Sequence, residues 1–128
     1  MLDKDRKISE KIARNYISEI LISIEYLHSK DVLYRDLKPD NVLVDANGHL
    51  KLTDFGLSAT NAGEAYSSTT FCGTPAYMPP DIIREIPYGK TVDWYCLGVL
   101  FYEFLHSQPP YIASTPEEMR ENILHGSL

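Results

Sequence analysis

The sequence predicts a single α+β domain that is predominantly helical and carries one short β-hairpin. Apolar residues recur at steps of three or four over long stretches, which is the period of a helix with one buried face. Only two short segments, separated by a turn, have the pattern of strands. The 128 residues are enough for one domain with a core, and their hydrophobic content of 44% is ordinary for a globular protein.

The first predicted element is a helix over residues 9–28, because apolar side chains in and beside this range form a stripe with helical spacing. Ser9 is of a residue type that caps helix N-termini, and residues 29–31 interrupt the pattern. We expect the helix to face the core and to support the segment that follows it. The stripe consists of Ile8, Ile12, Tyr16, Ile20, Ile24 and Leu27.

A β-hairpin is predicted next, and its turn contains Asn47 and Gly48, which are suited to positive φ. Antiparallel strands bring the two ends of a hairpin together. We therefore expect Asn41 and Asp54, which flank the hairpin thirteen positions apart, to lie close enough to share one metal site. The strands are predicted at residues 42–44 and 49–52.

Residues 57–80 lack periodicity and are rich in Ser, Thr, Gly and Ala up to Thr70. A loop of this length inside a compact domain is uncommon and is usually functional. Residues 93–105 are apolar nearly all round, as in a helix that is buried on most sides. We expect three aromatic side chains of this helix in the core. They are Trp94, Phe101 and Phe104.

The last predicted element is a helix from residue 116 to about residue 124. Thr115 stands at the N-cap, Pro116 is suited to the first helical position, and Glu118 completes a capping box. No repeats, low-complexity tracts or internal linkers interrupt the chain. We therefore expect one domain or a piece of one.

The composition excludes several classes of protein. The formal net charge of −6 argues against nucleic acid and anionic membranes as main partners. Two cysteines, Cys72 and Cys96, are too few for a disulfide framework, so we expect a reducing compartment, the cytoplasm or also the nucleus. The charged first seven residues do not resemble a signal peptide, and no apolar run is long enough for an integral membrane segment. The four histidines lack the spacing of a zinc site.

Residues 34–41, which read YRDLKPDN, place an acid, a base and an amide within one short turn. Asp36 offers a carboxylate that can accept a hydroxyl proton, and Lys38 offers a positive charge for a phosphate. Asn41, together with Asp54 of the following Asp-Phe-Gly, offers the hard oxygen ligands that Mg²⁺ prefers. These groups are the minimal set for phosphoryl transfer, in which positioning and charge neutralisation supply most of the catalysis.

The two stretches resemble the catalytic loop and the metal-binding motif of eukaryotic-type serine/threonine protein kinases, and the resemblance covers the chain from end to end. It is closest to the AGC group, which includes the cyclic-nucleotide-dependent kinases, protein kinase C, Akt and the ribosomal S6 kinases. Tyr34 in place of the commoner histidine is a habit of that group. The resemblance implies a kinase-like large (C-terminal) lobe whose hairpin carries the active-site loops, with the small lobe absent. Residues 1–128 are then a partial kinase domain, from the helix before the catalytic loop through the helix after the long buried helix.

The resemblance implies transfer of the γ-phosphate of ATP to a serine or threonine hydroxyl of a protein substrate, with ATP and Mg²⁺ as cofactors. Asp36 and Lys38 match the catalytic residues, and Lys38 also matches a contact to the γ-phosphate. Asn41 and Asp54 match the ligands of Mg²⁺ and, through it, of the nucleotide. Leu43 matches an apolar residue that packs beneath the adenine ring.

Two residues match regulatory positions of the family. Arg35 matches an arginine that binds a phosphate on the activation segment, and Thr70 matches the residue that carries it, so an upstream activating kinase is expected as a partner. In close relatives a lysine also contacts this phosphate, and here the position is Ala59. Our hypothesis is that phosphorylation still orders the loop, but less strongly. The alternative is that Thr70 is one hydroxyl in a loop rich in Ser and Thr.

Further matches concern the substrate and the support of the loop. Thr74 matches a threonine that touches the catalytic acid and lysine in serine/threonine kinases. Asp40 and Glu103 match acidic positions that receive a substrate arginine in basic-directed relatives, and the alternative for both is an exposed carboxylate. Asp93 matches a residue that hydrogen-bonds the backbone of the catalytic loop. Its place in an apolar helix points the same way, since a carboxylate is costly to bury unpaired.

The sequence departs from the family pattern in two ways. Ala76 and Asp81 each replace a usual glutamate and Pro79 a usual alanine, so the end of the activation segment is expected to differ in shape. The 128 residues also contain no glycine-rich nucleotide-covering loop, no strand lysine for the α and β phosphates and no partnering glutamate. A truncated, catalytically inactive fragment that acts as a binding module or pseudokinase is therefore the alternative to an active kinase.

Overall fold

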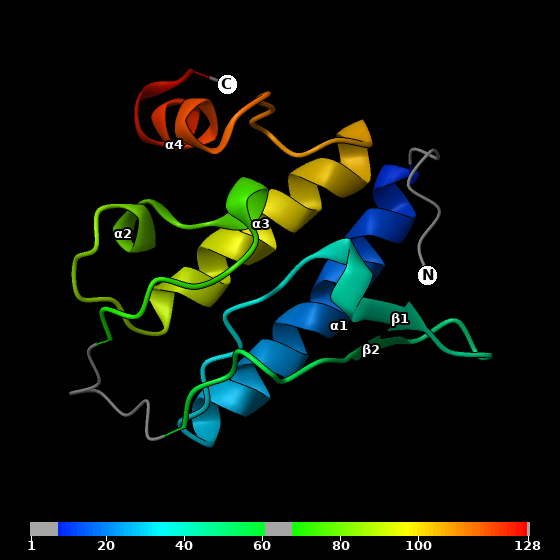
Figure 1. Ribbon diagram of the computed structural model, residues 1–128. Helices are drawn as coiled ribbons and strands as arrows, with labels where there is room; N and C mark the ends of the chain where they lie inside the picture. The colour runs from blue at the N-terminus through cyan, green and yellow to red at the C-terminus, as the bar shows by residue number, and fades with distance from the viewer. Residues whose placement is uncertain (1–7, 61–67, 128) are drawn as a thin grey trace.

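Two long helices, α1 (Glu10–Ser29) and α3 (Thr91–His106), lie side by side at the centre of the computed structural model, which describes residues 8–60 and 68–127 (Figure 1). The hairpin packs along α1, and the shorter helices lie on the other side of α3. The predicted α+β architecture, mainly helical with one short antiparallel hairpin, is confirmed. The remaining elements are the 3₁₀ turn η1 (Pro39–Asn41), strands β1 (Val42–Val44) and β2 (Leu50–Leu52), the 3₁₀ turn η2 (Pro75–Tyr77), and helices α2 (Pro80–Ile83) and α4 (Pro116–His125).

Helix α1 follows the predicted boundaries, since Ser9 takes the N-cap position and the helix ends one residue after the predicted end. Ile20 and Ile24 are buried as expected, but the prediction for Ile12 is wrong, because this residue is 45% exposed. A strict step of four residues rotates around a helix by about 40° per step, so the predicted stripe could not stay on one face. Ala13 takes the buried place instead.

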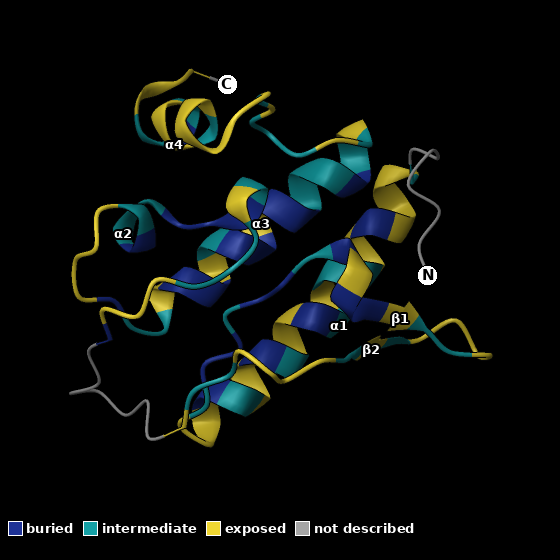
Figure 2. Cartoon of the chain, in the orientation of Figure 1, coloured by how far each residue is buried: buried dark blue, intermediate teal, exposed yellow. Residues whose placement is uncertain are grey.

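The main core lies between the facing sides of α1 and α3 and is closed by residues of the loop and hairpin that follow α1 (Figure 2). A second, smaller cluster lies beneath α2 and the start of α3. The main cluster consists of Ala13, Ile20, Ile24, Tyr34, Leu37, Val42, Cys96, Leu97, Leu100 and Phe104. The smaller cluster consists of Leu33, Met78, Ile82, Tyr88 and Val92.

One side of α3 is less buried than predicted. Phe104 is buried and Phe101 is half-buried, but the prediction for Trp94 is wrong, because this residue is 38% exposed. Trp94 lies beside an open apolar hollow of about 280 Å³, which Gly98 and Tyr102 also line. An apolar helix is buried all round only where other elements cover every side, and this side stays open in the described part of the chain.

The hairpin has the predicted antiparallel pairing, but its turn differs from the prediction. Gly48 has φ 86°, whereas Asn47 is not among the residues with positive φ. The Asp45 carboxylate accounts for this, because its Oδ1 accepts hydrogen bonds from the backbone N–H groups of Asn47 (2.8 Å) and His49 (3.0 Å). Since the Asp45 N–H also donates to the His49 carbonyl (2.8 Å), the loop has three residues, and only its last one takes the left-handed conformation.

Glu19 of α1 fixes the hairpin to the helix. Its Oε2 accepts a hydrogen bond from the backbone N–H of Leu50 (2.7 Å), and its Oε1 lies 3.0 Å from Nδ1 of His49. The bond from Leu50, followed by the contact with His49, lowers the pKa of Glu19 below its ordinary value. The same contact with Glu19 raises the pKa of His49.

Helix α4 begins with the predicted N-cap at Thr115, but the Glu118 carboxylate bonds the residue before the cap and not Thr115 itself. The Thr115 hydroxyl accepts a hydrogen bond from the Glu118 N–H (3.2 Å), and the Glu118 carboxylate accepts one from the Ser114 N–H (2.9 Å). The helix packs against α2 and η2, so that η2 contacts both α3 and α4. Among the described residues, no helix combines the length and the apolar character that crossing a bilayer needs.

We expect Glu19→Gln to destabilise the protein by up to about 1 kcal/mol near neutral pH, a small value because the carboxylate is partly exposed. A carboxylate whose folded pKa lies below the unfolded value stabilises the fold above that unfolded value, which is 4.5 here. This contribution is lost as the pH falls through the folded pKa. The raised pKa of His49 adds stability below its unfolded value of 6.5 and none well above its folded pKa.

Urea unfolding of both proteins across this range measures the effect. The difference is expected to be largest between the two unfolded pKa values, smaller at alkaline pH, and absent in strong acid. Glu25→Gln, at an exposed position of the same helix, is the matched control. A difference between wild type and Glu19→Gln that does not depend on pH would contradict the proposed interaction.

Candidate active site

The backbone of the loop at residues 34–41 is held by Asp93, a residue of the first turn of α3 that has no exposed surface. Its Oδ1 accepts a hydrogen bond from the Arg35 N–H (2.8 Å), and its Oδ2 accepts one from the Tyr34 N–H (3.0 Å). The same Oδ2 lies 2.7 Å from Nε2 of His28, at the end of α1. The predicted contact of Asp93 with the loop backbone is thus present, and His28 is a third partner that the sequence did not suggest.

Arg35 has φ 67°, in the left-handed region that a residue with a Cβ atom rarely adopts. The two hydrogen bonds that Asp93 accepts from consecutive N–H groups hold the chain in this conformation. As a result the next side chain, that of Asp36, lies in a site where only 7% of the residue is exposed.

The Asp36 carboxylate lies at the centre of a polar cluster. Its Oδ2 lies 2.9 Å from the Lys38 ammonium and accepts a hydrogen bond from the Asn41 amide (2.8 Å). Its Oδ1 accepts a hydrogen bond from the Thr74 hydroxyl (3.0 Å). Lys38 in turn donates to the Thr74 oxygen (3.0 Å), so the acid, the base and the threonine form a closed triangle.

Asn41 joins this cluster to the hairpin. Its Nδ2 donates to both the backbone carbonyl and the carboxylate of Asp36 (2.8 Å each). The backbone carbonyl of Asn41 accepts hydrogen bonds from the Thr53 N–H (2.9 Å) and the Thr53 hydroxyl (3.1 Å). The two ends of the hairpin are therefore adjacent at the level of the backbone, as expected from antiparallel pairing, and Asp54 follows directly.

Asp54 is exposed and has φ 55°, and its Oδ1 accepts a hydrogen bond from the Gly56 N–H (3.0 Å). Because the Asn41 amide directs its N–H bonds to Asp36, its oxygen is the group that remains for a cation. An amide oxygen and a carboxylate are ligands of the kind that Mg²⁺ prefers. The described residues contain no cluster of three or more Asp, Glu, His and Cys suited to a metal, so further ligands would come from a bound phosphate or water.

Tyr34 links the loop to the Asp-Phe-Gly stretch. Its hydroxyl donates to the Thr53 carbonyl, and its ring packs edge-on against Phe55 at 5.4 Å between centroids. Burial, followed by the nearby carboxylates of Asp36 and Asp54, raises the pKa of Tyr34, so the hydroxyl stays protonated and can donate. The sequence marked Tyr34 only as a habit of a kinase group, and nothing in its neighbours indicated this long-range role.

Arg35 and Thr70 are linked through a third residue. The Arg35 guanidinium donates from Nε to the Leu57 carbonyl (2.7 Å) and from Nη1 to the Tyr88 hydroxyl (3.2 Å). The Tyr88 hydroxyl donates to the Thr70 carbonyl (2.8 Å). Ala59, the position where relatives are expected to have a lysine, pairs its backbone with Leu33. Tyr88 was not among the candidate site residues, because a tyrosine before a helix resembles any core residue.

The other candidate residues surround this cluster. Leu43 lies in the middle of β1, opposite Lys51 of β2, and is 43% exposed. Asp40 lies in η1 and is exposed, and Glu103 lies in the last turn of α3 and is half-buried.

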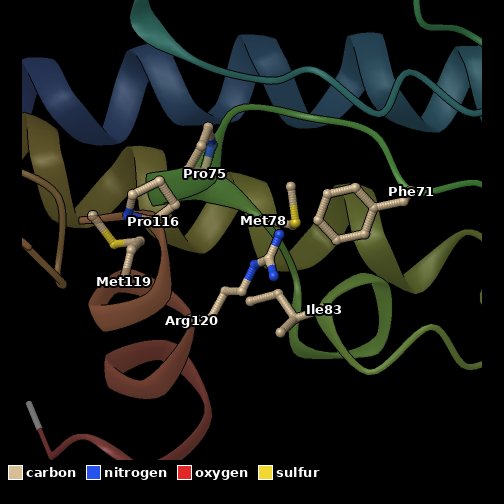
Figure 3. Close-up of a pocket in the computed structure, with 7 residues that line it drawn as sticks. All are labelled: Phe71, Pro75, Met78, Ile83, Pro116, Met119 and Arg120. Carbon is tan, nitrogen blue, oxygen red and sulfur yellow. The ribbon is translucent and has the colours of Figure 1, made fainter.

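A small apolar pocket of about 50 Å³ lies between the segment at residues 71–83 and α4 (Figure 3). The guanidinium of Arg120 lies over the ring of Phe71, 5.2 Å from its centroid. Sequence reasoning missed this pocket, because its two walls are far apart in the chain and carry ordinary apolar residues. The lining residues are Phe71, Pro75, Met78, Ile83, Pro116, Met119 and Arg120.

Comparison with known proteins gives one consistent result. The protein kinase domain matches residues 1–128. The chain is 46% identical over 127 residues to the serine/threonine-protein kinase Sgk2 of Homo sapiens, with 99% of this chain and 35% of that protein covered. It is 48% identical over 127 residues to Sgk3 of Rattus norvegicus, with 99% and 26% covered. It is 43% identical over 136 residues to Protein kinase 3 of Dictyostelium discoideum, with 99% and 15% covered. The chain thus spans about a third or less of these curated relatives.

We expect Asp93→Asn to destabilise the protein by about 2–4 kcal/mol, because an amide at this buried position leaves an N–H donor of the loop without an acceptor. Urea unfolding measures the loss. Asp31→Asn is the matched control, since Asp31 is exposed and its ion pair with Lys90 is worth less than about 1 kcal/mol. Equal stability of Asp93→Asn and wild type would show that Asp93 does not hold the loop.

Proposed function

The chain belongs to the protein kinase domain family, and from this premise we propose that it carries the catalytic residues of a serine/threonine kinase that uses ATP and Mg²⁺ to phosphorylate proteins. The single observation that carries the proposal is the triangle of Asp36, Lys38 and Thr74. It joins a proton acceptor, a cation for a phosphate and a hydroxyl from a distant segment within hydrogen-bonding distance.

Asp36 is proposed to accept the proton of the substrate hydroxyl and to aim its oxygen. A carboxylate has about four acceptor sites. Two donors, Lys38 and Asn41, contact Oδ2, and one, Thr74, contacts Oδ1. One site of Oδ1 therefore remains for the hydroxyl that forms the new bond to phosphorus as the bond between the γ-phosphorus and its bridging oxygen breaks.

Lys38 and the metal ligands are proposed to offset negative charge. The Lys38 side chain is 22% exposed, so its ammonium can contact a phosphate while its pairing with Asp36 holds its position. Asn41 and Asp54 fit Mg²⁺ by the chemistry of their oxygens. When bound, Mg²⁺ would neutralise charge on the nucleotide phosphates. Leu43, exposed on β1, is proposed to pack beneath the adenine ring.

The substrate is proposed to be a protein segment with basic residues around a serine or threonine. The carboxylates of Asp40 and Glu103 support basic residues, because each could pair with an arginine. The apolar pocket lined by Pro75 and Met78 supports a small apolar side chain in the substrate segment (Figure 3). The formal net charge of the chain, −6, also favours a basic substrate.

Residues 1–128 are proposed to be the part of a kinase domain that lies in its large lobe. The order of helix, loop, hairpin, Asp-Phe-Gly and long apolar helix supports this placement. We also propose the cytoplasm as the compartment, with the nucleus as the second possibility, which the free thiols of Cys72 and Cys96 support.

A second candidate function is a binding module without catalysis. It is favoured by an open apolar hollow of about 480 Å³ between α1, β2 and Phe55, whose side chain is 49% exposed. Exposed apolar surface of this kind is typical of an interface with another protein or domain. The lining residues are Ile22, Ser23, Tyr26, Leu27, Leu52 and Phe55.

Asp36→Asn separates the two candidates. We expect it to lower phosphate transfer to a basic serine peptide at least about 100-fold, because the proton acceptor is lost while the shape is kept. Transfer of radiolabelled phosphate from ATP measures the effect, with Glu121→Gln on the exposed side of α4 as control. Absence of transfer by the wild-type protein, together with retained peptide binding, would favour the binding module.

Phosphorylation of Thr70 is expected in the active protein. Thr70 is exposed, so a kinase can reach it. Arg35 is linked to Thr70 through the Tyr88 hydroxyl, which bonds both residues. Mass spectrometry of the protein from its own cells detects the modification, and unmodified Thr70 in a preparation clearly more active than Thr70→Val would refute it. Thr70→Val is expected to lower activity severalfold, whereas Thr69→Val, at the exposed neighbouring position, is not.

A further inference from the structure

Tyr88 lies between α2 and α3 and joins segments that are remote in the sequence. The residue is buried, with 4% of its surface exposed. Its backbone pairs with that of Ser68 through two hydrogen bonds, from the Ser68 N–H to the Tyr88 carbonyl (3.1 Å) and from the Tyr88 N–H to the Ser68 carbonyl (3.0 Å). The position of its ring is therefore fixed by the core and by this pairing.

The Tyr88 hydroxyl makes two complementary hydrogen bonds. It donates to the Thr70 carbonyl (2.8 Å) and accepts from Nη1 of Arg35 (3.2 Å), and Sγ of Cys72 lies 3.8 Å away. A phenol has one proton to give and lone pairs to receive, so both bonds form at once. Burial raises the pKa of Tyr88, which keeps this proton in place at neutral pH.

The short segment from residue 70 to residue 74 is consequently held at both ends. At one end the Tyr88 hydroxyl holds the Thr70 carbonyl, and at the other end Asp36 and Lys38 hold the Thr74 hydroxyl. Between them, Gly73 has φ 113°. A Cβ at this glycine would lie 3.6 Å from the Arg35 carbonyl, which shows how closely the segment passes the loop.

We propose that the Tyr88 hydroxyl is a positioning group for phosphoryl transfer, which ties Arg35 to the Thr70 carbonyl and so keeps Thr74 against Asp36 and Lys38 when Thr70 carries no phosphate. The inference rests on the proposed kinase function. It gives the unphosphorylated protein a basal activity that depends on one neutral hydroxyl.

A phosphate on Thr70 reduces the importance of the Tyr88 hydroxyl for the position of the segment. A guanidinium has five N–H donors and binds phosphate oxygens more strongly than it binds a phenol. With Arg35 bound to such a phosphate, the segment has a second anchor at the same end, and the Tyr88 hydroxyl becomes partly redundant. The contribution of Tyr88 to kcat therefore depends on the phosphorylation state. A purely structural role of the residue would give the same contribution in both states.

Tyr88→Phe tests the proposal, because phenylalanine fills the same volume in the core and removes only the hydroxyl. The variant and the wild type are compared without phosphate and with phosphothreonine encoded at position 70. Without phosphate we expect kcat for a basic serine peptide to fall about fivefold to tenfold, with KM nearly unchanged. With phosphate we expect a loss of less than about twofold.

Tyr16→Phe is the matched control, since it removes a hydroxyl from another tyrosine, which is partly buried against the main core and packs on Phe104. We expect it to leave kcat unchanged in both states. An equal loss of kcat for Tyr88→Phe in both states, or a lowered melting temperature with kcat unchanged, overturns the proposal.

Amide hydrogen exchange over residues 68–74 gives a readout that does not depend on activity. In the unphosphorylated protein, Tyr88→Phe is expected to speed exchange in this segment about tenfold, and Tyr16→Phe is not. If the wild type transfers no phosphate, the proposed function fails, and faster exchange in Tyr88→Phe still supports the anchoring of the segment. Unchanged exchange in that variant overturns it.

Discussion

The carboxylate of Asp93 is the group on which the geometry of the site depends. It has no exposed surface, and burying an ionised group without partners costs several kcal/mol. The N–H groups of Tyr34 and Arg35 and the ring of His28 supply the compensation. These partners come from α1 and from the loop, while Asp93 belongs to α3. The packing of the two long helices therefore fixes the loop that carries the reactive groups.

Much of the fold could be predicted from local chemistry. The N-cap at Thr115 and the antiparallel pairing of the hairpin depend on residues within a few positions, and both were predicted correctly, although Asn47 does not take the expected positive φ. The errors arose at residues whose burial depends on the packing of elements that are distant in the sequence. Ile12 is apolar like a core residue, but its position in the helical period places it on the exposed side of α1. Trp94 would be buried only if another element covered its side of α3.

The candidate site was predicted in part for the same reason. Asp36 and Lys38 could be found because polar groups that act together stand close in the sequence, and hairpin geometry brought Asn41 next to the residue before Asp54. Tyr34 contributes through a contact with Thr53, which no spacing rule indicates. An aromatic residue with a hydroxyl serves equally well as core or as a link, so its role becomes visible only when its partner is placed.

Two of the five described non-glycine residues with positive φ belong to the candidate site. Arg35 and Asp54 both have positive φ, which costs a residue with a Cβ about 1–3 kcal/mol when the surroundings impose it. One stands directly before Asp36, and the other carries a proposed metal ligand. A glycine at either position would relieve the strain but would lose the guanidinium or the carboxylate. The proposed roles of the two side chains account for the absence of glycine at these positions, and the hydrogen bond that Asp93 accepts from the Arg35 N–H offsets the strain there.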